Sequence, residues 1–226
     1  EEALSLDRVE ELVFRFTLED STAFTRLASL PRSRSPASTD NPVLLDNGFR
    51  YEGEQIVQWD TPIPPSENDQ ILARLNTFPG VDVYYMARSF LGQEMYAADF
   101  LLPVDAEFVS QAKLNALKPT LLLSGRQHAN EVSSTSHILR LGELLATDSA
   151  YADLLKKVNV VLPPITNADG ARLAVQMQEI NPDFMLHAGY LGALGVDIAA
   201  GQNSDDPIYP ESKVRPRLWE TWLPDI

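Results

Sequence analysis

The sequence predicts an α/β fold, and three segments carry this prediction. A continuous apolar run at 119–125, PTLLLSG, has the length and composition of a buried strand. From Val132 onward, apolar side chains recur with helical spacing, as in a helix that covers a sheet. A second apolar run at 158–165, VNVVLPPI, supplies another buried strand. The order strand, helix, strand is typical of α/β domains.

A helix and a hairpin are expected before this unit. Ser66 can cap a helix that stops near Pro79-Gly80. The apolar face of this helix is formed by Ile71, Leu72 and Leu75. Alternating segments at 81–89 and 94–102 flank a short turn and predict a β-hairpin.

Residues 1–65 are expected to form an N-terminal extension or a small accessory region. A strand is predicted at 9–18, VEELVFRFTL. From 31 to 66 the composition shifts to Pro, Ser and other loop-forming residues, which is typical of a linker. We therefore place a boundary near residue 65, with the larger domain at 66–226.

Composition excludes several classes of protein. Eighteen basic and thirty-two acidic residues give a net charge of −14, which repels phosphate backbones, so no nucleic-acid partner is expected. No apolar run approaches the roughly 18 residues that a spanning helix needs, so no membrane span is expected. The chain has no cysteine, so any metal must be held by His, Asp or Glu.

One short motif carries residues suited to chemistry. At 124–131 the sequence reads SGRQHANE, with His128 and Glu131 three residues apart where a buried strand gives way to a helix. Loops at this end of the strands form the ligand crevice of open α/β sheets, so the two side chains can face one point. Such a pair is half of a zinc hydrolase site, which takes three N or O ligands and a water. The alternative is a helix-start glutamate beside a surface histidine.

Two further motifs accompany this one in a fixed order. The hairpin turn at 89–93 reads SFLGQ, and the strand after the helix ends in NADG at 167–170. The ordered set resembles the carboxypeptidase A-like zinc carboxypeptidase family, in which the hairpin contains S-x-x-G-R, the metal motif is H-x-x-E and the later strand ends in N-P-D-G. The resemblance covers about residues 67–226 and implies a mixed central sheet flanked by helices.

The resemblance implies that His128 and Glu131 are the first two ligands of a Zn²⁺ ion. A water polarised by the metal would attack a peptide-like amide, at a carboxyl-terminal residue, so a peptide or peptide-like substrate is the expected partner. The family takes its third ligand, its general-base Glu and a substrate-contacting Tyr from later segments. Residues 66–226 would thus be the N-terminal portion of a catalytic domain truncated at its C-terminus. The remainder of that domain would be a required partner, without which the chain is inactive.

The other two histidines are weaker ligand candidates. His137 lies about 240° around the helix from Glu131, so it should point away from the site. His187 follows a turn and could reach the crevice in a variant site, although a loop histidine bonded to backbone is the simpler interpretation.

The family also grips the substrate's terminal carboxylate with arginines, for which planar bidentate pairing is suited. The segment where an Asn-Arg pair is expected, 195–203, reads GVDIAAGQN and contains no arginine. Arg172 could act as the clamp, although an exposed helix-start arginine is the simpler interpretation. Arg215 and Arg217 are expected in surface ion pairs.

Two alternative functions stay open. The string HANE also resembles the H-G-N-E of aspartoacylase relatives, which would make the protein a zinc-dependent deacylase of N-acyl amino acids. Because the ligand set is incomplete, the fold could instead serve as a binding module without catalysis. Substrate size separates the first alternative from the peptidase, and loss of metal binding would favour the second.

Overall fold

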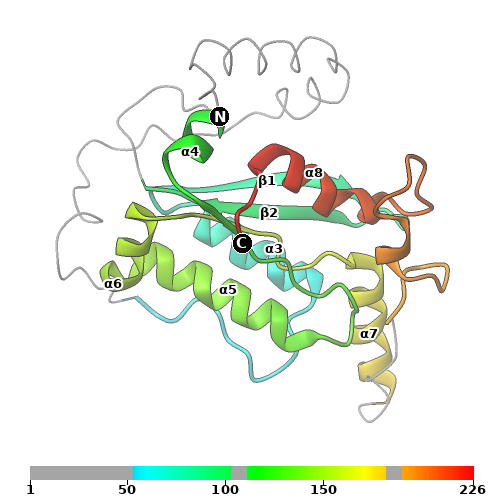
Figure 1. Ribbon diagram of the computed structural model, residues 1–226. Helices are drawn as coiled ribbons and strands as arrows, with labels where there is room; N and C mark the ends of the chain where they lie inside the picture. Colours follow the sequence, from blue (N-terminus) through cyan, green and yellow to red (C-terminus); the bar gives the residue numbers. More distant parts are fainter. Residues whose placement is uncertain (1–52, 103–110, 182–189) are drawn as a thin grey trace. The chain divides into compact units, whose positions relative to one another are not determined.

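Four strands form one mixed sheet in the computed structural model, which describes residues 53–102, 111–181 and 190–226 (Figure 1). In spatial order they are β1 (Val81–Arg88), β2 (Glu94–Phe100), β4 (Asn159–Leu162) and β3 (Thr120–Leu122). β2 pairs antiparallel with both β1 and β4, whereas β3 and β4 are parallel. The predicted α/β class and mixed sheet are confirmed. The strand predicted at 9–18 lies outside the described residues.

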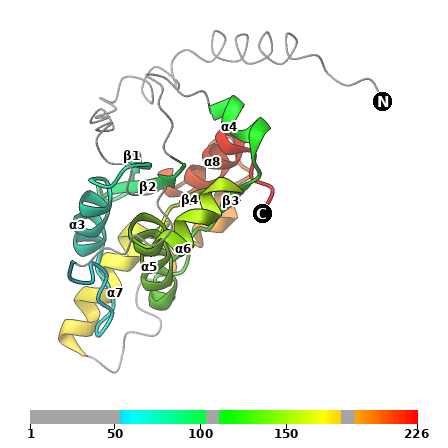
Figure 2. The ribbon, with the colours of Figure 1, turned by 90° about the vertical axis from the view of Figure 1, so that its left-hand side faces the viewer.

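Helices cover both faces of this sheet. Figures 1 and 2 show α3 and α5 on one face and α4 and α8 on the other. Within the described ranges, no helix is both long and apolar enough to cross a membrane. The bounds are α3 (Pro65–Leu75), α4 (Gln111–Leu117), α5 (Val132–Thr147), α6 (Ser149–Ala152), η2 (Asp153–Lys156), α7 (Ala168–Ile180), η4 (Ile198–Gly201), η5 (Pro210–Lys213) and α8 (Val214–Trp222).

Each face of the sheet has its own apolar core. The first core joins α3 and α5 to the sheet, and Leu72, Leu75 and Leu139 are among its fully buried members. The second joins α4, α7 and α8 to the opposite face, with Trp222 buried in it. Burial of these two surfaces supplies the main force that holds the sheet between its helices.

The helix predicted after the linker forms, but it begins differently. Its first residue is Pro65 and no side chain caps it, so Ser66 is not the N-cap. Proline is favoured at the first helical position because its missing N–H would have no partner there. The stretch before it has no helix or strand, yet Val57 and Ile63 are fully buried in the first core. The boundary predicted near residue 65 stays a prediction.

The carboxyl ends of β3 and β4 are bound together. Thr166 donates to the Gly125 carbonyl through both its N–H (3.0 Å) and its Oγ1 (2.9 Å), and the Asn167 N–H donates to the Arg126 carbonyl at 3.1 Å. A Cβ on Gly125 would lie 2.7 Å from the Pro164 carbonyl oxygen, so only glycine allows this approach. The loops after the two parallel strands therefore meet.

The outer edge of β3 pairs with the last residues of the chain. Leu122 N–H donates to the Ile226 carbonyl at 2.9 Å, and Ile226 N–H donates to the Thr120 carbonyl at 3.4 Å. This alternation of donor and acceptor about one residue is the parallel ladder pattern. The segment that ends at Ile226 therefore runs in the same direction as β3, toward the loop that carries His128.

Candidate metal centre

A sharp turn at Arg126 directs the chain from β3 into α5. Arg126 has a φ of 51°, and its N–H donates to Ser134 Oγ, which donates to the Glu131 carbonyl at 2.6 Å. The guanidinium is buried and donates to the carbonyls of Ala129 (2.9 Å) and Ile63 (2.5 Å). Burial without a carboxylate partner lowers the pKa of Arg126 to about 10. The turn is thus tied to α5 and to the core.

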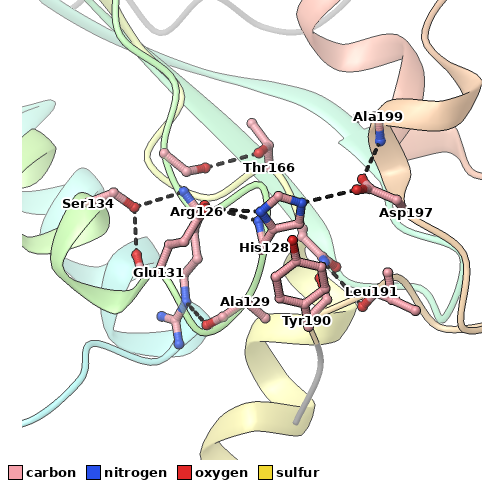
Figure 3. A network of polar contacts seen from close by, with 12 residues as sticks. Arg126, His128, Ala129, Glu131, Ser134, Thr166, Tyr190, Leu191, Asp197 and Ala199 are labelled. Atoms are coloured by element: carbon pink, nitrogen blue, oxygen red, sulfur yellow. Dashed lines mark hydrogen bonds and ion pairs between the residues drawn. The ribbon is translucent and has the colours of Figure 1, made fainter. Parts of the chain in front are cut away.

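This turn brings His128 and Glu131 together, as the sequence predicts (Figure 3). His128 Nδ1 lies 2.9 Å from Glu131 Oε1, and the His128 N–H donates to Glu131 Oε2 at 3.1 Å. On the far side of the ring, Nε2 lies 3.0 Å from Oδ2 of Asp197. The imidazole therefore sits between two carboxylates, and its side chain is 17% exposed.

The two carboxylates decide the charge of the imidazole. Partial burial alone would lower the pKa of His128, but hydrogen bonds and charges from Glu131 and Asp197 raise it. Burial works against a low pKa at Asp197 too, yet the Ala199 N–H, His128 and the charge of Arg215 together lower the pKa of that carboxyl. The surroundings of His128 therefore stabilise a positive charge on the imidazole.

A tyrosine covers one face of the imidazole. The ring centroids of Tyr190 and His128 are 4.1 Å apart and the planes differ by 5°, a stacked arrangement visible in Figure 3. Asn167, the first residue of NADG, donates from Nδ2 to the carbonyls of Tyr190 (3.4 Å) and Leu191 (3.2 Å). The motif after β4 thus holds the segment that covers the histidine.

The rest of NADG holds the hairpin turn. Asp169 is 2% exposed and accepts from Ser89 Oγ at 2.6 Å and from the Leu91 N–H at 2.8 Å. Glu211 from η5 accepts from the Phe90 N–H at 3.2 Å. Burial, opposed by backbone donors and reinforced by the charge of Asp169, raises the pKa of Glu211 to about 7. Asp169 and Glu211 therefore both accept hydrogen bonds from the turn at 89–93.

His137 takes no part in the site. His137 is exposed on α5, whereas His187 lies outside the described residues. Arg172, the clamp candidate, is half-buried on α7, and its Nε is buried without a hydrogen-bond partner. It is therefore not the exposed helix-start arginine of the simpler interpretation.

Arg215 does not make the surface ion pair that the sequence predicts. Neither it nor Arg217 makes an ion pair with any residue that the structure describes, so the predicted surface pairs are wrong. Arg215 is half-buried, and its guanidinium lies 5.9 Å from the ring centroid of Trp219. Burial lowers its pKa, while the charges of Asp197 and Glu131 raise it, so this guanidinium acts on both acids of the site.

Comparison with known proteins identifies the family of the chain. The sequence model of the zinc carboxypeptidase family matches residues 69–192, more than half of the 226 residues. The chain belongs to the zinc carboxypeptidase family. No curated protein matches the sequence.

Solved carboxypeptidases share the fold. The metallo-carboxypeptidase from Burkholderia cenocepacia is 18% identical, with a TM-score of 0.51 over 69% of this chain and 37% of that one. The carboxypeptidase A from Helicoverpa armigera is 16% identical, with a TM-score of 0.52 over 95% of this chain and 56% of that one. The chain thus spans about a third of the length of the bacterial enzyme and just over half of the insect one.

The donors at His128 suit the zinc that the family's name implies. Zn–N and Zn–O bonds of about 2.0–2.2 Å put two ligands of one ion about 3 Å apart, near the spacing of His128 Nδ1 and Glu131 Oε1. Asp197 faces the other ring nitrogen, so it cannot complete the same ion's shell. Across the described ranges, no three His, Asp or Glu side chains are placed to hold a metal. The described part of this zinc carboxypeptidase family member therefore offers two donors.

Sequence reasoning missed Tyr190 and Asp197, which contact His128, and Glu211, which binds the hairpin turn. Asp197 lies in the segment 195–203, where the family resemblance predicts an arginine. An Asp before a short helix is a capping signal, and this signal could have identified Asp197. Tyr190 and Glu211 carry no local signal, because each reaches its partner through the folded chain.

Proposed function

We propose that this chain is part of a zinc-dependent hydrolase that cleaves peptide-like amides at a carboxyl-terminal residue, with His128 and Glu131 as two zinc ligands. The observation that carries the proposal is the convergence of His128 Nδ1 and Glu131 Oε1, 2.9 Å apart, in a member of the zinc carboxypeptidase family. Zinc, when bound, activates water at neutral pH and stabilises negative charge on the carbonyl oxygen.

The protein's own groups prepare His128 for a metal. A protonated Nε2 donates a hydrogen bond to Asp197, which fixes the tautomer of His128. The Nδ1 lone pair, which faces Glu131, is then available to ligate a metal. In the metal-free protein, a proton between Nδ1 and Glu131 occupies the position that a cation would take. Metal binding therefore releases a proton, and affinity falls as pH falls.

A third ligand would come from the remainder of the catalytic domain. The pairing of Ile226 with β3 supports this proposal, because a chain that continues along the same edge reaches the loop of His128 within a few residues. The short share of the bacterial relative that this chain covers, 37%, supports it too.

Arg215 is our candidate for binding the substrate's terminal carboxylate. It is a half-buried guanidinium whose charge acts on Asp197 and Glu131, yet its donors are free of ion pairs with the residues described. An arginine in this state can pair with a carboxylate in a bidentate geometry without first losing another partner.

Zinc titration of the chain tests the proposed site. His128→Ala should weaken zinc binding by about 100-fold or more, since loss of a ligand exceeds the roughly 10- to 100-fold effect of outer-shell changes. His137→Ala is the matched control, because it removes an exposed histidine from the same region and should leave affinity unchanged. A protein continued past Ile226 should bind zinc more tightly than this chain.

Equal affinity in the parent protein and His128→Ala would refute the assignment. If neither the chain nor its continued form binds zinc, the fold acts as a binding module. Hydrolysis of short N-acyl amino acids without hydrolysis of peptides would favour the deacylase.

A further inference from the structure

We propose that Tyr190 is a positioning residue for His128, whose stacked ring holds the imidazole at the tilt that aims Nδ1 at Glu131. The inference rests on the proposed function, since it assigns Tyr190 a role in metal binding. Tyr190 is 37% exposed, so its ring is held at the surface of the site rather than packed into either core.

The hydrogen bonds of His128 do not fix its tilt by themselves. The contacts at Nε2 and Nδ1, of 3.0 and 2.9 Å, act on the edge of the imidazole and leave its faces free. Such bonds weaken only gradually when the ring rotates about the Cβ–Cγ axis, because hydrogen-bond angles have a broad optimum. A flat surface against the ring face opposes that rotation directly.

Tyr190 supplies that surface. At 4.1 Å between centroids and 5° between planes, its ring lies parallel to the imidazole at contact distance. A tilt of the imidazole would push one ring edge into the tyrosine and lift the other edge away.

The tyrosine backbone is itself anchored. Asn167 is fully buried and donates to the carbonyls of Tyr190 and Leu191, while its Oδ1 accepts from the Gly170 N–H at 2.9 Å. This amide therefore couples the first turn of α7 to the segment that carries the stacking ring. The restraint on His128 runs from β4 through Asn167 to Tyr190.

The aromatic ring, rather than the hydroxyl, performs this role. The Tyr190 hydroxyl makes no hydrogen bond to any residue in the described ranges. Phenylalanine should consequently replace it, whereas leucine keeps apolar bulk but loses the flat face. The two substitutions separate stacking from both hydrogen bonding and simple burial.

Two measurements on the 226-residue protein test the proposal. In metal-free protein, Tyr190→Leu should move the His128 ring-proton resonances downfield, because the shielding by a stacked ring is lost, and Tyr190→Phe should leave them nearly in place. In zinc titrations, Tyr190→Leu should weaken affinity roughly three- to tenfold, the range expected for one aromatic pair. Tyr190→Phe should stay within about twofold of the parent. Tyr151→Leu, a tyrosine on α6 with similar exposure (39%), should change neither quantity.

Each outcome bears on the inference. Unchanged His128 resonances in Tyr190→Leu would show that the rings do not stack and would overturn it. Equal weakening by Phe and Leu would assign the effect to the hydroxyl and also overturn it. If His128→Ala leaves zinc affinity intact, the proposed function fails, whereas intact affinity in Tyr190→Leu beside a loss in His128→Ala rejects only the role of Tyr190.

Discussion

The loops that follow β3 and β4 lie side by side, yet the polar residues of the HANE and NADG motifs differ in exposure. After β3, His128 and Glu131 keep 17% and 46% of their side-chain surface exposed. After β4, Asn167 and Asp169 are 0% and 2% exposed. In the sequence, both motifs follow a buried apolar run and contain an acidic residue.

The difference teaches how to separate a site from its support. Buried polar groups must be satisfied within the protein, and the two oxygens of Asp169 accept from the hairpin turn. Those oxygens have little capacity left for a ligand. His128 and Glu131 meet at a partly exposed point, where we propose that a cation binds. The NADG motif therefore holds the neighbouring segments in place, whereas the HANE motif contains the two proposed ligands.

The largest test of this comparison is Asp169→Ala. The change leaves Ser89 Oγ and the Leu91 N–H without their acceptor in a buried corner, so we expect a loss of about 3 kcal/mol in the free energy of unfolding. Urea denaturation measures it. His128→Ala should cost less, about 1 kcal/mol in the same assay, because it removes one aromatic stack and contacts to two partly exposed carboxylates.

The reverse pattern would break the comparison. If Asp169→Ala keeps its stability but loses zinc affinity to the extent of His128→Ala, then Asp169 belongs to the site. Ser89→Ala serves as the control, since it removes one donor of the same corner and should cost only part of the Asp169→Ala loss.

Much of the fold could be predicted because it depends on local patterns. The hairpin at 81–102, the helix from Val132 and the two apolar runs are visible in residue spacing, and all four formed, although the first run yields only a three-residue strand, β3. His128 and Glu131 were predictable as a pair for the same reason, since they are three residues apart in one turn.

The surroundings of that pair were not predictable, because they depend on contacts between distant segments. Asp197 is 69 residues from His128 in the sequence, and Glu211 is 121 residues from Phe90, whose N–H donates to it. Periodicity within a segment cannot reveal such partners. The prediction that Ser66 caps a helix was wrong for a local reason. The neighbouring Pro65 starts the helix without a side-chain cap.

An intermediate effect, on KM, is expected from Arg215→Gln. It tests whether a residue beside the proposed ligands contacts substrate or only supports the fold. In zinc-loaded protein continued past Ile226, the change should raise KM about tenfold for a peptide with a free terminal carboxylate, the size of one charge-assisted contact, with kcat nearly unchanged. The same peptide with an amidated terminus should show no change. Arg217→Gln is the matched control, because Arg217 is the exposed arginine two residues along the same helix. Equal effects on both peptides would exclude carboxylate binding by Arg215.

The smallest effect concerns the buried acids beneath the hairpin and appears as a pH dependence of stability. Chiefly because of burial, the pKa of Glu211 is about 7 in the folded protein, against 4.5 for an ordinary glutamate. The stability that its protonated form contributes is present below pH 4.5 and is lost as pH rises through 7, where the buried Glu211 carboxyl ionises. Between pH 5 and 8, Tm of the parent should therefore fall by about 3 °C more than Tm of Glu211→Gln. Glu220→Gln, an exposed glutamate on α8, should follow the parent. An identical fall in Glu211→Gln would show that the ionisation of Glu211 does not cause the pH dependence.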